Sequence, residues 1–103
     1  MRRAARIDAN QPAVVAEFRA RGATVQPLHP VGDGCPDLLV GYQGVNLLVE
    51  VKDGSKPPSA RKLTDDQQTW HREWRGQRCI IDTVEQVKPL LEDIRRDNRG
   101  KQS

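Results

Sequence analysis

The stretch Gly34–Lys52, GCPDLLVGYQGVNLLVEVK, decides the fold of this chain. It holds two apolar runs on either side of Gln43-Gly44, and a glycine at that place is typical of a hairpin turn. With Gln43-Gly44 at the tip of a β-hairpin, Tyr42 faces Val45. Counting back one residue at a time along both strands from this pair sets Asp37 directly across from Glu50. The stretch therefore predicts one antiparallel strand pair with two acidic residues facing each other at its open end.

The charged residues of this hairpin gather on one face. Side chains alternate between the faces of a strand, so Lys52 shares a face with Glu50 while Val51 points away. Opposed Cβ atoms lie about 4.5–5.5 Å apart, and facing carboxylates such as Asp37 and Glu50 destabilise the pair unless a cation lies between them. Carboxylate and carbonyl oxygens are the ligands that Mg²⁺ prefers. The pattern indicates a divalent-metal site, with a solvated face of ion pairs as the alternative.

A family resemblance follows from these residues. Pro36-Asp37, then twelve residues, then Glu50-Val51-Lys52 resembles the PD-(D/E)XK signature of restriction-endonuclease-like nucleases. The flanking sequence resembles the virus-type replication-repair nuclease branch, VRR-NUC. That branch shows Gly-x-Pro-Asp-Leu before the hairpin and Leu-Thr-x-x-Gln after it, which residues 34–38 and 63–67 match. The resemblance covers roughly residues 8–88.

The resemblance implies an active site and a cofactor. Asp37 and Glu50, with the Val51 carbonyl, would hold Mg²⁺ or Mn²⁺ beside a scissile phosphate. Lys52 would position the attacking water and offset charge on the phosphate. The family also has a glutamine by the active site at the position of Gln67. Since that residue suits a helix cap equally well, both roles stay open.

Further acidic residues leave the number of metal ions open. The family often carries an acidic residue on its first helix that points into the site. Asp8 is the better positional match here, and Glu17 lies further along that helix. Asp33 could support a second metal ion, although Gly-Asp-Gly is also simply a turn.

The segments before the hairpin predict a helix and an edge strand. A helix begins near residues 8–11, with Asp8 or Asn10 as its cap and Pro12 tolerated in the first turn. A short strand follows over residues 23–28, and Pro27 favours an edge position because it cannot donate to a ladder.

The segments after the hairpin predict a helix, a strand and a last helix. Thr64 begins a capping box for a helix that runs to about Arg75. A strand covers residues 77–82. The last helix starts at Thr83, with a kink or a restart at Pro89.

Together these elements predict an α/β domain of order α-β-β-β-α-β(-α). The hairpin is apolar on both faces beyond its acidic end, so we expect helices on both sides of a mixed sheet. This is the restriction-endonuclease-like core that the resemblance implies. We expect the domain to span residues 8–97, with basic flexible tails at 1–7 and 98–103.

The aromatic and histidine residues have structural interpretations first. Trp70 and Trp74 lie one turn apart on a predicted helix, which favours a place in the core over stacking on bases. His71, beside them, is expected at the surface. His29 is expected to be neither a ligand nor a base.

Composition narrows the class of protein. The net charge of +3 and the pI of about 9.2 permit nucleic-acid binding without requiring it. No apolar run is long enough to span a bilayer, and we expect no signal peptide in the first residues because no apolar run follows their charges. Cys35 and Cys79 lack the spacing of a zinc site, so we expect two reduced thiols in a cytoplasmic protein of a bacterial or phage-infected cell.

Three basic residues of the loop after the hairpin are expected to contact the DNA backbone: Lys56, Arg61 and Lys62.

The resulting hypothesis is a Mg²⁺- or Mn²⁺-dependent DNA endonuclease. A single domain leaves no room for a unit that reads base sequence, so selectivity should come from DNA shape. A homodimer would carry two sites related by a two-fold axis, as the cutting of branched DNA in repair or recombination requires. We therefore expect a Holliday-junction-resolvase-like preference. The alternatives are a nuclease acting on linear single-stranded or flap DNA, a non-catalytic nucleic-acid-binding module and a partner-binding protein.

Overall fold

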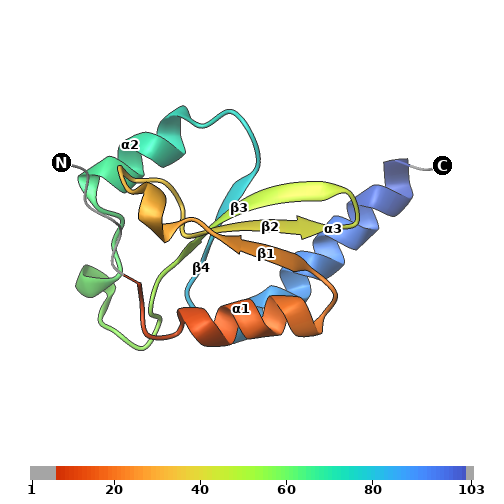
Figure 1. The fold of residues 1–103 in the computed structure, drawn as a ribbon, viewed down its shortest axis with the longest axis horizontal. Helices are drawn as coiled ribbons and strands as arrows, with labels where there is room; N and C mark the ends of the chain where they lie inside the picture. Colours follow the sequence, from red (N-terminus) through yellow and green to blue (C-terminus); the bar gives the residue numbers. More distant parts are fainter. Residues whose placement is uncertain (1–6, 102–103) are drawn as a thin grey trace.

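The computed structural model describes residues 7–101 (Figure 1). Its order of elements confirms the α-β-β-β-α-β-α prediction. The helices and strands are α1 (Gln11–Ala20), β1 (Thr24–Pro27), β2 (Leu38–Tyr42), β3 (Val45–Val51), α2 (Asp65–Glu73), β4 (Arg78–Ile81) and α3 (Val87–Lys101). Short 3-10 turns lie at His29–Val31, Pro58–Ala60 and Val84–Gln86. The predicted tails include residues 1–6 and 102–103, which lie outside the described residues.

The four strands form a mixed sheet of order β1-β2-β3-β4. The first three strands are antiparallel neighbours, and β4 runs parallel to β3. The hairpin register is the predicted one, from Tyr42 opposite Val45 to Leu38 opposite Val49. At its tip, Gln43 has a φ of 50° and Gly44 a φ of 79°. Both values lie in the left-handed region that a two-residue type I′ turn requires, so the turn fixes the register.

The two outer strands behave as their sequences indicate. β1 is an edge strand, where Pro27 costs no interior ladder bond. The connection from β3 to the parallel β4 passes over the sheet and carries α2, as a parallel pair requires. This crossover brings α2 to the open end of the hairpin.

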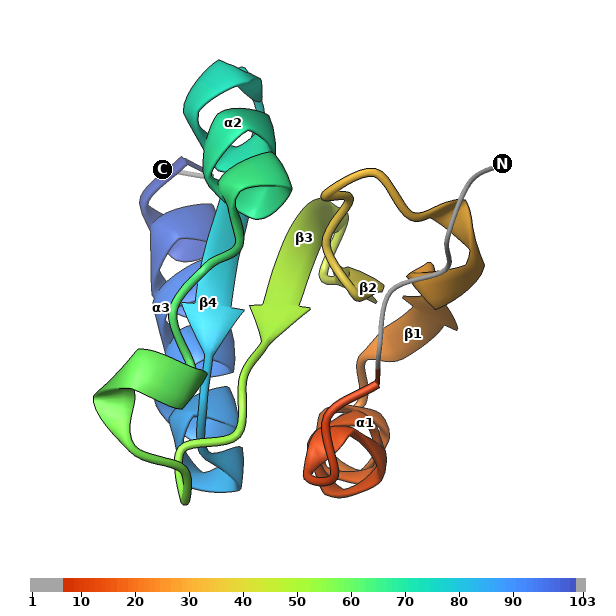
Figure 2. The ribbon, with the colours of Figure 1, turned by 90° about the vertical axis from the view of Figure 1, so that its left-hand side faces the viewer.

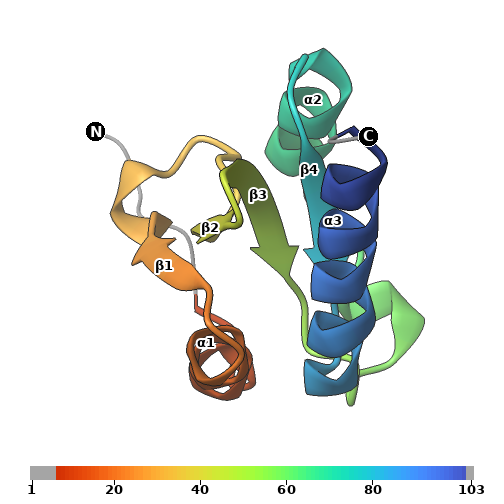
Figure 3. The same ribbon diagram turned by 90° about the vertical axis from the view of Figure 1, so that its right-hand side faces the viewer.

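The main core lies between one face of the sheet and the helices α1 and α3. Figures 2 and 3 show these two helices on one side of the sheet and α2 on the other. Alternate residues of the hairpin point into this core, which also receives one stripe from each helix. Its buried residues include Val14, Phe18, Leu38, Val40, Leu47, Val49, Val51, Ile81, Val87 and Leu91.

The opposite face is covered less completely. Helices flank both faces as predicted, but α2 has only nine residues and lies over the end of β3 that carries Glu50. Leu39 and Leu48 are half-buried on this face, and Ile80 is exposed. The sheet is therefore closed on its apolar side and partly open on its charged side.

The break in the last helix lies before Val87, two residues ahead of the predicted restart at Pro89, and the helix is longer than predicted. A 3-10 turn at Val84–Gln86 precedes α3, so Pro89 is the third residue of the α-helix, where its missing N–H costs no bond. The helix continues to Lys101 and takes in much of the predicted tail 98–103. No helix within residues 7–101 is long and apolar enough to cross a membrane.

Candidate active site

Two carboxylates are buried at the open end of the hairpin. Asp37, just before β2, is 3% exposed, and Glu50 in β3 is 1% exposed. The backbone N–H of Val51 donates a 2.8 Å hydrogen bond to Asp37 Oδ2. Because Val51 directly follows Glu50, this bond holds the two carboxylates next to each other across the strand pair.

Burial and proximity oppose the ionisation of both groups at once. Burial is the largest cause that raises the pKa of Glu50, to about 9, and the neighbouring Asp37 adds to it through hydrogen bonding and repulsion. The Lys52 ammonium opposes the rise, and Asp8 contributes to it. The pair is therefore stable only with a proton or a cation between its oxygens.

Gln67 makes hydrogen bonds both in the helix cap and to the charged residues of the site. At the start of α2, its backbone N–H donates to Thr64 Oγ1 at 3.2 Å, and its Oε1 accepts from the Thr64 N–H at 2.9 Å. The same Oε1 accepts from Lys52 Nζ at 2.7 Å, while Nε2 donates to Glu50 Oε2 at 3.2 Å. The cap thus holds a side chain that joins Glu50 to Lys52.

Gly34 allows the loop before Asp37 to pack against α2. Its φ of +82° lies in the left-handed region, and a Cβ at this position would lie 2.4 Å from the backbone oxygen of Asp66. Since Asp66 is in the first turn of α2, the loop before Asp37 packs directly on the helix that carries Gln67. Only glycine allows this approach.

A cavity of about 330 Å³ opens beside these groups. Asp8 lines it, whereas Glu17 pairs with Arg21 on α1 and does not. Asp33 is not among its lining residues either. The Cys35 thiol is also in the wall, and burial, then Glu50 and Asp37, raise its pKa. The complete lining is Asp8, Gly34, Cys35, Glu50, Lys52, Lys56, Ala60, Thr64, Asp66 and Gln67.

The three basic residues of the loop lie in different surroundings. Lys56 Nζ lies 3.8 Å from Asp8 Oδ1 at the cavity. The Arg61 guanidinium is half-buried and donates to Asp82 Oδ2 at 3.1 Å. Lys62 is exposed. The loop therefore offers Lys62 to a ligand most directly, while Arg61 has a structural partner.

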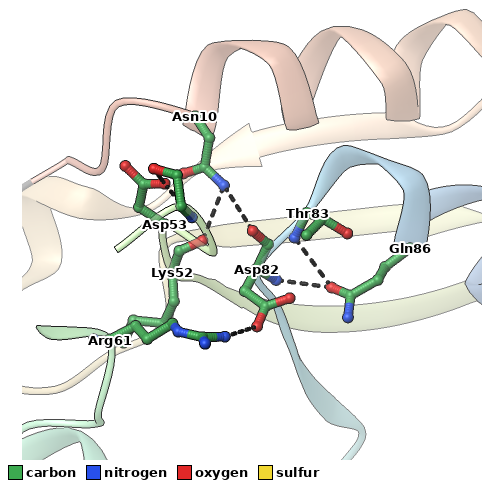
Figure 4. Close-up of polar contacts among 8 residues, drawn as sticks. Asn10, Lys52, Asp53, Arg61, Asp82, Thr83 and Gln86 are labelled. Carbon is green, nitrogen blue, oxygen red and sulfur yellow. Dashed lines mark hydrogen bonds and ion pairs between the residues drawn. The ribbon is translucent and has the colours of Figure 1, made fainter. Parts of the chain in front are cut away.

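Asn10 makes hydrogen bonds to the residues that directly follow β3 and β4 (Figure 4). Its Nδ2 donates to the backbone oxygens of Lys52 at 2.9 Å and Asp82 at 3.3 Å. Asn10, one of the two predicted cap residues, stands at the N-cap position of α1, but its side chain makes no cap hydrogen bond there. Its amide instead joins the ends of β3 and β4, where Gln86 Oε1 also accepts from the N–H groups of Asp82 and Thr83.

His71 is buried, so its predicted surface position is wrong. It is 5% exposed and lies one turn after Gln67 on α2, with Nε2 3.9 Å from Glu50 Oε1. Burial, then the charges of Arg78 and Lys52, lower the pKa of its ring. The sequence held one usable signal, because a residue four positions after Gln67 shares its helix face.

The two tryptophans form a stacked pair at the surface side of α2. Their ring centroids lie 4.7 Å apart with planes 15° from parallel. Trp70 is half-buried and Trp74 is 46% exposed, so the predicted core position is wrong for Trp74. The inward face of this short helix is taken by Gln67 and His71, which leaves the larger aromatic rings at its edge.

The donor set fits a lightly coordinated divalent cation. Within the described part of the chain, no group of three or more histidine, cysteine, aspartate or glutamate side chains is arranged to hold a metal ion. Mg²⁺ commonly uses one or two carboxylates and completes its shell with water and substrate phosphate. Asp37 and Glu50 provide such a pair, and Glu50 Oε1 has no hydrogen-bond partner among residues 7–101.

Comparison with known proteins agrees with this geometry. No family model and no curated protein matches the chain. A solved structure described as "VRR_NUC domain" is similar to it, with 31% sequence identity and a TM-score of 0.60. The match covers 80% of this chain and 89% of that chain. The chain therefore belongs to the VRR-NUC domain family, with the restriction-endonuclease-like fold of a PD-(D/E)XK-type nuclease.

Proposed function

We propose that this chain is a Mg²⁺- or Mn²⁺-dependent DNA endonuclease. The observation that carries the proposal is the buried Asp37–Glu50 pair, of which Glu50 lines an open cavity together with Lys52. Burying two facing carboxylates is costly without a compensating charge, and a solvated ion-pair face would not bury them. Membership of a nuclease family makes a DNA phosphodiester the natural substrate.

The proposed metal ligands are Asp37, Glu50 and the carbonyl oxygen of Val51. A bound Mg²⁺ or Mn²⁺ supplies Lewis-acid polarisation of the phosphoryl oxygens and makes water a better nucleophile. The Val51 N–H orients Asp37 from one side, and Gln67 orients Glu50 from the other. Both carboxylates are therefore positioned before any cation arrives.

Lys52 is a positively charged side chain of the protein at the proposed site. Its Nζ, held 2.7 Å from Gln67 Oε1, lies on the cavity wall with Glu50. A fixed ammonium at this place offsets negative charge that develops on the phosphate and orients a water molecule by hydrogen bonding. Because the contact with Gln67 leaves two of the three ammonium protons for other partners, Lys52 can hold the phosphate and the water together.

We further propose a homodimer that prefers branched DNA, with four-way junctions first. A single site of this kind cuts one strand, so a symmetric pair is needed to cut two strands of a junction. Within this domain, DNA shape and backbone contacts would select the substrate.

A cleavage panel tests the proposal. Single strands, flaps, nicked duplexes, linear duplexes and four-way junctions are incubated with Mg²⁺, Mn²⁺ or a chelator, and the mass in solution is measured by light scattering. We expect metal-dependent cleavage, fastest on junctions, by a dimer. DNA binding without cleavage in the presence of any of these cations would overturn the proposed nuclease activity. A monomer that degrades linear single strands as fast as junctions would overturn the dimer and the junction preference.

A further inference from the structure

Two buried polar atoms without partners face each other behind the carboxylate pair. Glu50 Oε1 has no hydrogen-bond partner among the described residues, and neither nitrogen of His71 has one. The distance from His71 Nε2 to Glu50 Oε1 is 3.9 Å, about 1 Å longer than a normal hydrogen bond. Buried polar groups in native proteins are nearly always paired, so two such atoms in contact range need an explanation.

The ring of His71 is held by packing and not by hydrogen bonds. It packs against the ring of Trp70 in a T-shaped arrangement, with centroids 5.5 Å apart and planes at 73°. The backbone oxygen of His71 accepts from Arg78 Nε at 2.7 Å, which fixes this turn of α2 against β4. These contacts set the orientation of the imidazole and leave its nitrogens to other partners.

Gln67 and His71 together flank the two oxygens of one carboxylate. They lie four residues apart and so share a face of α2. Gln67 Nε2 already donates to Glu50 Oε2, and His71 Nε2 lies 3.9 Å from Oε1. An oxygen of a carboxylate has two lone pairs, so Oε1 can accept from an imidazole N–H and bind a cation at the same time.

We propose that His71 is a positioning residue for Glu50, which closes the 3.9 Å gap and donates Nε2–H to Oε1 when a divalent cation occupies the site. This role rests on the proposed metal-dependent function. The donated bond fixes the direction of the second lone pair of Oε1, and the Gln67 bond does the same for Oε2. Partners of this kind, one step behind a metal ligand, typically change metal affinity about 10–100-fold when they are removed.

Titration of the chelator-treated protein with Mn²⁺, followed by calorimetry or by the electron paramagnetic resonance of free Mn²⁺, measures the effect without catalysis. The variants are His71→Phe, which keeps a ring but lacks the donor, and His71→Gln, which keeps a donor. His29→Ala is the matched control, because His29 is half-buried and lies outside the cavity. We expect His71→Phe to weaken Mn²⁺ binding about 10–100-fold. His71→Gln should stay within a few-fold of the wild type, and His29→Ala should match it.

A second measurement uses the wild-type protein alone. Long-range ¹H–¹⁵N spectra report which nitrogen of each histidine carries the proton. We expect the Nε2–H tautomer for His71 and a shift of its resonances when Mg²⁺ is added, with His29 unaffected. A proton on Nδ1 of His71 would overturn the proposal even if the Phe variant did not fold.

The outcomes separate the two proposals. If Mn²⁺ binding depends on Glu50 but is unchanged in a folded His71→Phe variant, the positioning role is wrong and the metal site stands. Equal loss in the Phe and Gln variants also overturns it, because shape and not the donor would then matter. If Glu50→Ala binds Mn²⁺ as the wild type does, the proposed metal site itself fails.

Discussion

The two faces of one strand pair carry different tasks. Leu38 and Val49 point into the core beneath the sheet, and their chain neighbours Asp37 and Glu50 point to the opposite side. All four side chains are buried, but only the first pair is apolar. Burial of the apolar pair therefore stabilises the fold, whereas burial of the two carboxylates destabilises it.

This difference between the two faces predicts which mutations should affect stability and which should affect function. Changes on the core face should lower stability and leave the chemistry of each folded molecule intact. Changes on the acidic face should remove function and leave the fold intact or even more stable.

The largest expected effect follows from the acidic face itself. Asp37→Ala, Glu50→Ala and Lys52→Ala should each lower the cleavage rate at least about 10²–10³-fold, with cooperative unfolding retained. Leu38→Ala on the core face should instead cost about 2–5 kcal/mol of stability and keep its turnover per folded molecule. Cleavage assays and denaturant melts on the same preparations check both halves. Near wild-type cutting by Glu50→Ala would show that the site assignment is wrong.

Two glycines with similar φ angles test the contact between the loop and α2. Gly34→Ala should cost roughly 2–5 kcal/mol, because it adds a clash with Asp66 to the left-handed strain. Gly44→Ala should cost only the strain of about 1–2 kcal/mol, since nothing lies within 4 Å of the position where its Cβ would be. Chemical denaturation measures both. Equal costs would mean that the loop does not press on the helix.

The buried glutamate should make the metal-free protein less stable as pH rises. The folded state keeps the Glu50 proton up to a pKa of about 9, whereas the unfolded chain loses it near its ordinary value of 4.5. Between these values the folded state binds more protons, so stability falls as pH increases, by up to about 1.4 kcal/mol per pH unit. Melts in chelator over this range should show that slope in the wild type and lose it in Glu50→Gln. An unchanged slope in the variant would assign the effect to other groups.

The hairpin and its register could be predicted because they depend on local chemistry. Gln43-Gly44 fixes the turn, the turn fixes the register, and the register sets Asp37 across from Glu50. The capping box at Thr64 is equally local, and the helix begins where it indicates. Each of these features involves residues that are close in sequence or paired through a single turn.

The surroundings of α2 and of Asn10 could not be predicted in the same way. Whether His71 or Trp74 points at the sheet depends on how a nine-residue helix is rotated about its axis, and both satisfy helical periodicity. Asn10 has the right residue type for a cap, but its side chain accepts no cap bond and its Nδ2 instead donates to two distant strand ends. Such choices are made by tertiary contacts that a single sequence does not reveal.

Gln67→Glu separates the two roles of that residue. Glutamate can still cap the helix, so the melting temperature should stay close to that of the wild type. It cannot donate to Glu50 Oε2, and it adds a third negative charge there, so activity should fall about 10–100-fold. Thr64→Ala is the converse control, with a loss of about 1 kcal/mol in stability and near-normal turnover. Normal activity in Gln67→Glu would confine Gln67 to the cap.

The smallest expected effect concerns the basic loop, where Arg61 and Lys62 are neighbours in different surroundings. Lys62 is exposed and suited to a phosphate contact, whereas Arg61 is paired with Asp82. Each phosphate contact releases counterions, so Lys62→Ala should reduce the slope of log affinity against log salt by about one, for all duplex sequences alike. Arg61→Ala should leave that slope unchanged and cost about 0.2–1 kcal/mol of stability, as for a partly exposed ion pair. Fluorescence anisotropy with a labelled duplex at several salt concentrations measures the slopes in chelator. If Arg61→Ala lowered the slope and Lys62→Ala did not, the loop would have to move on DNA and exchange its internal ion pair for phosphate.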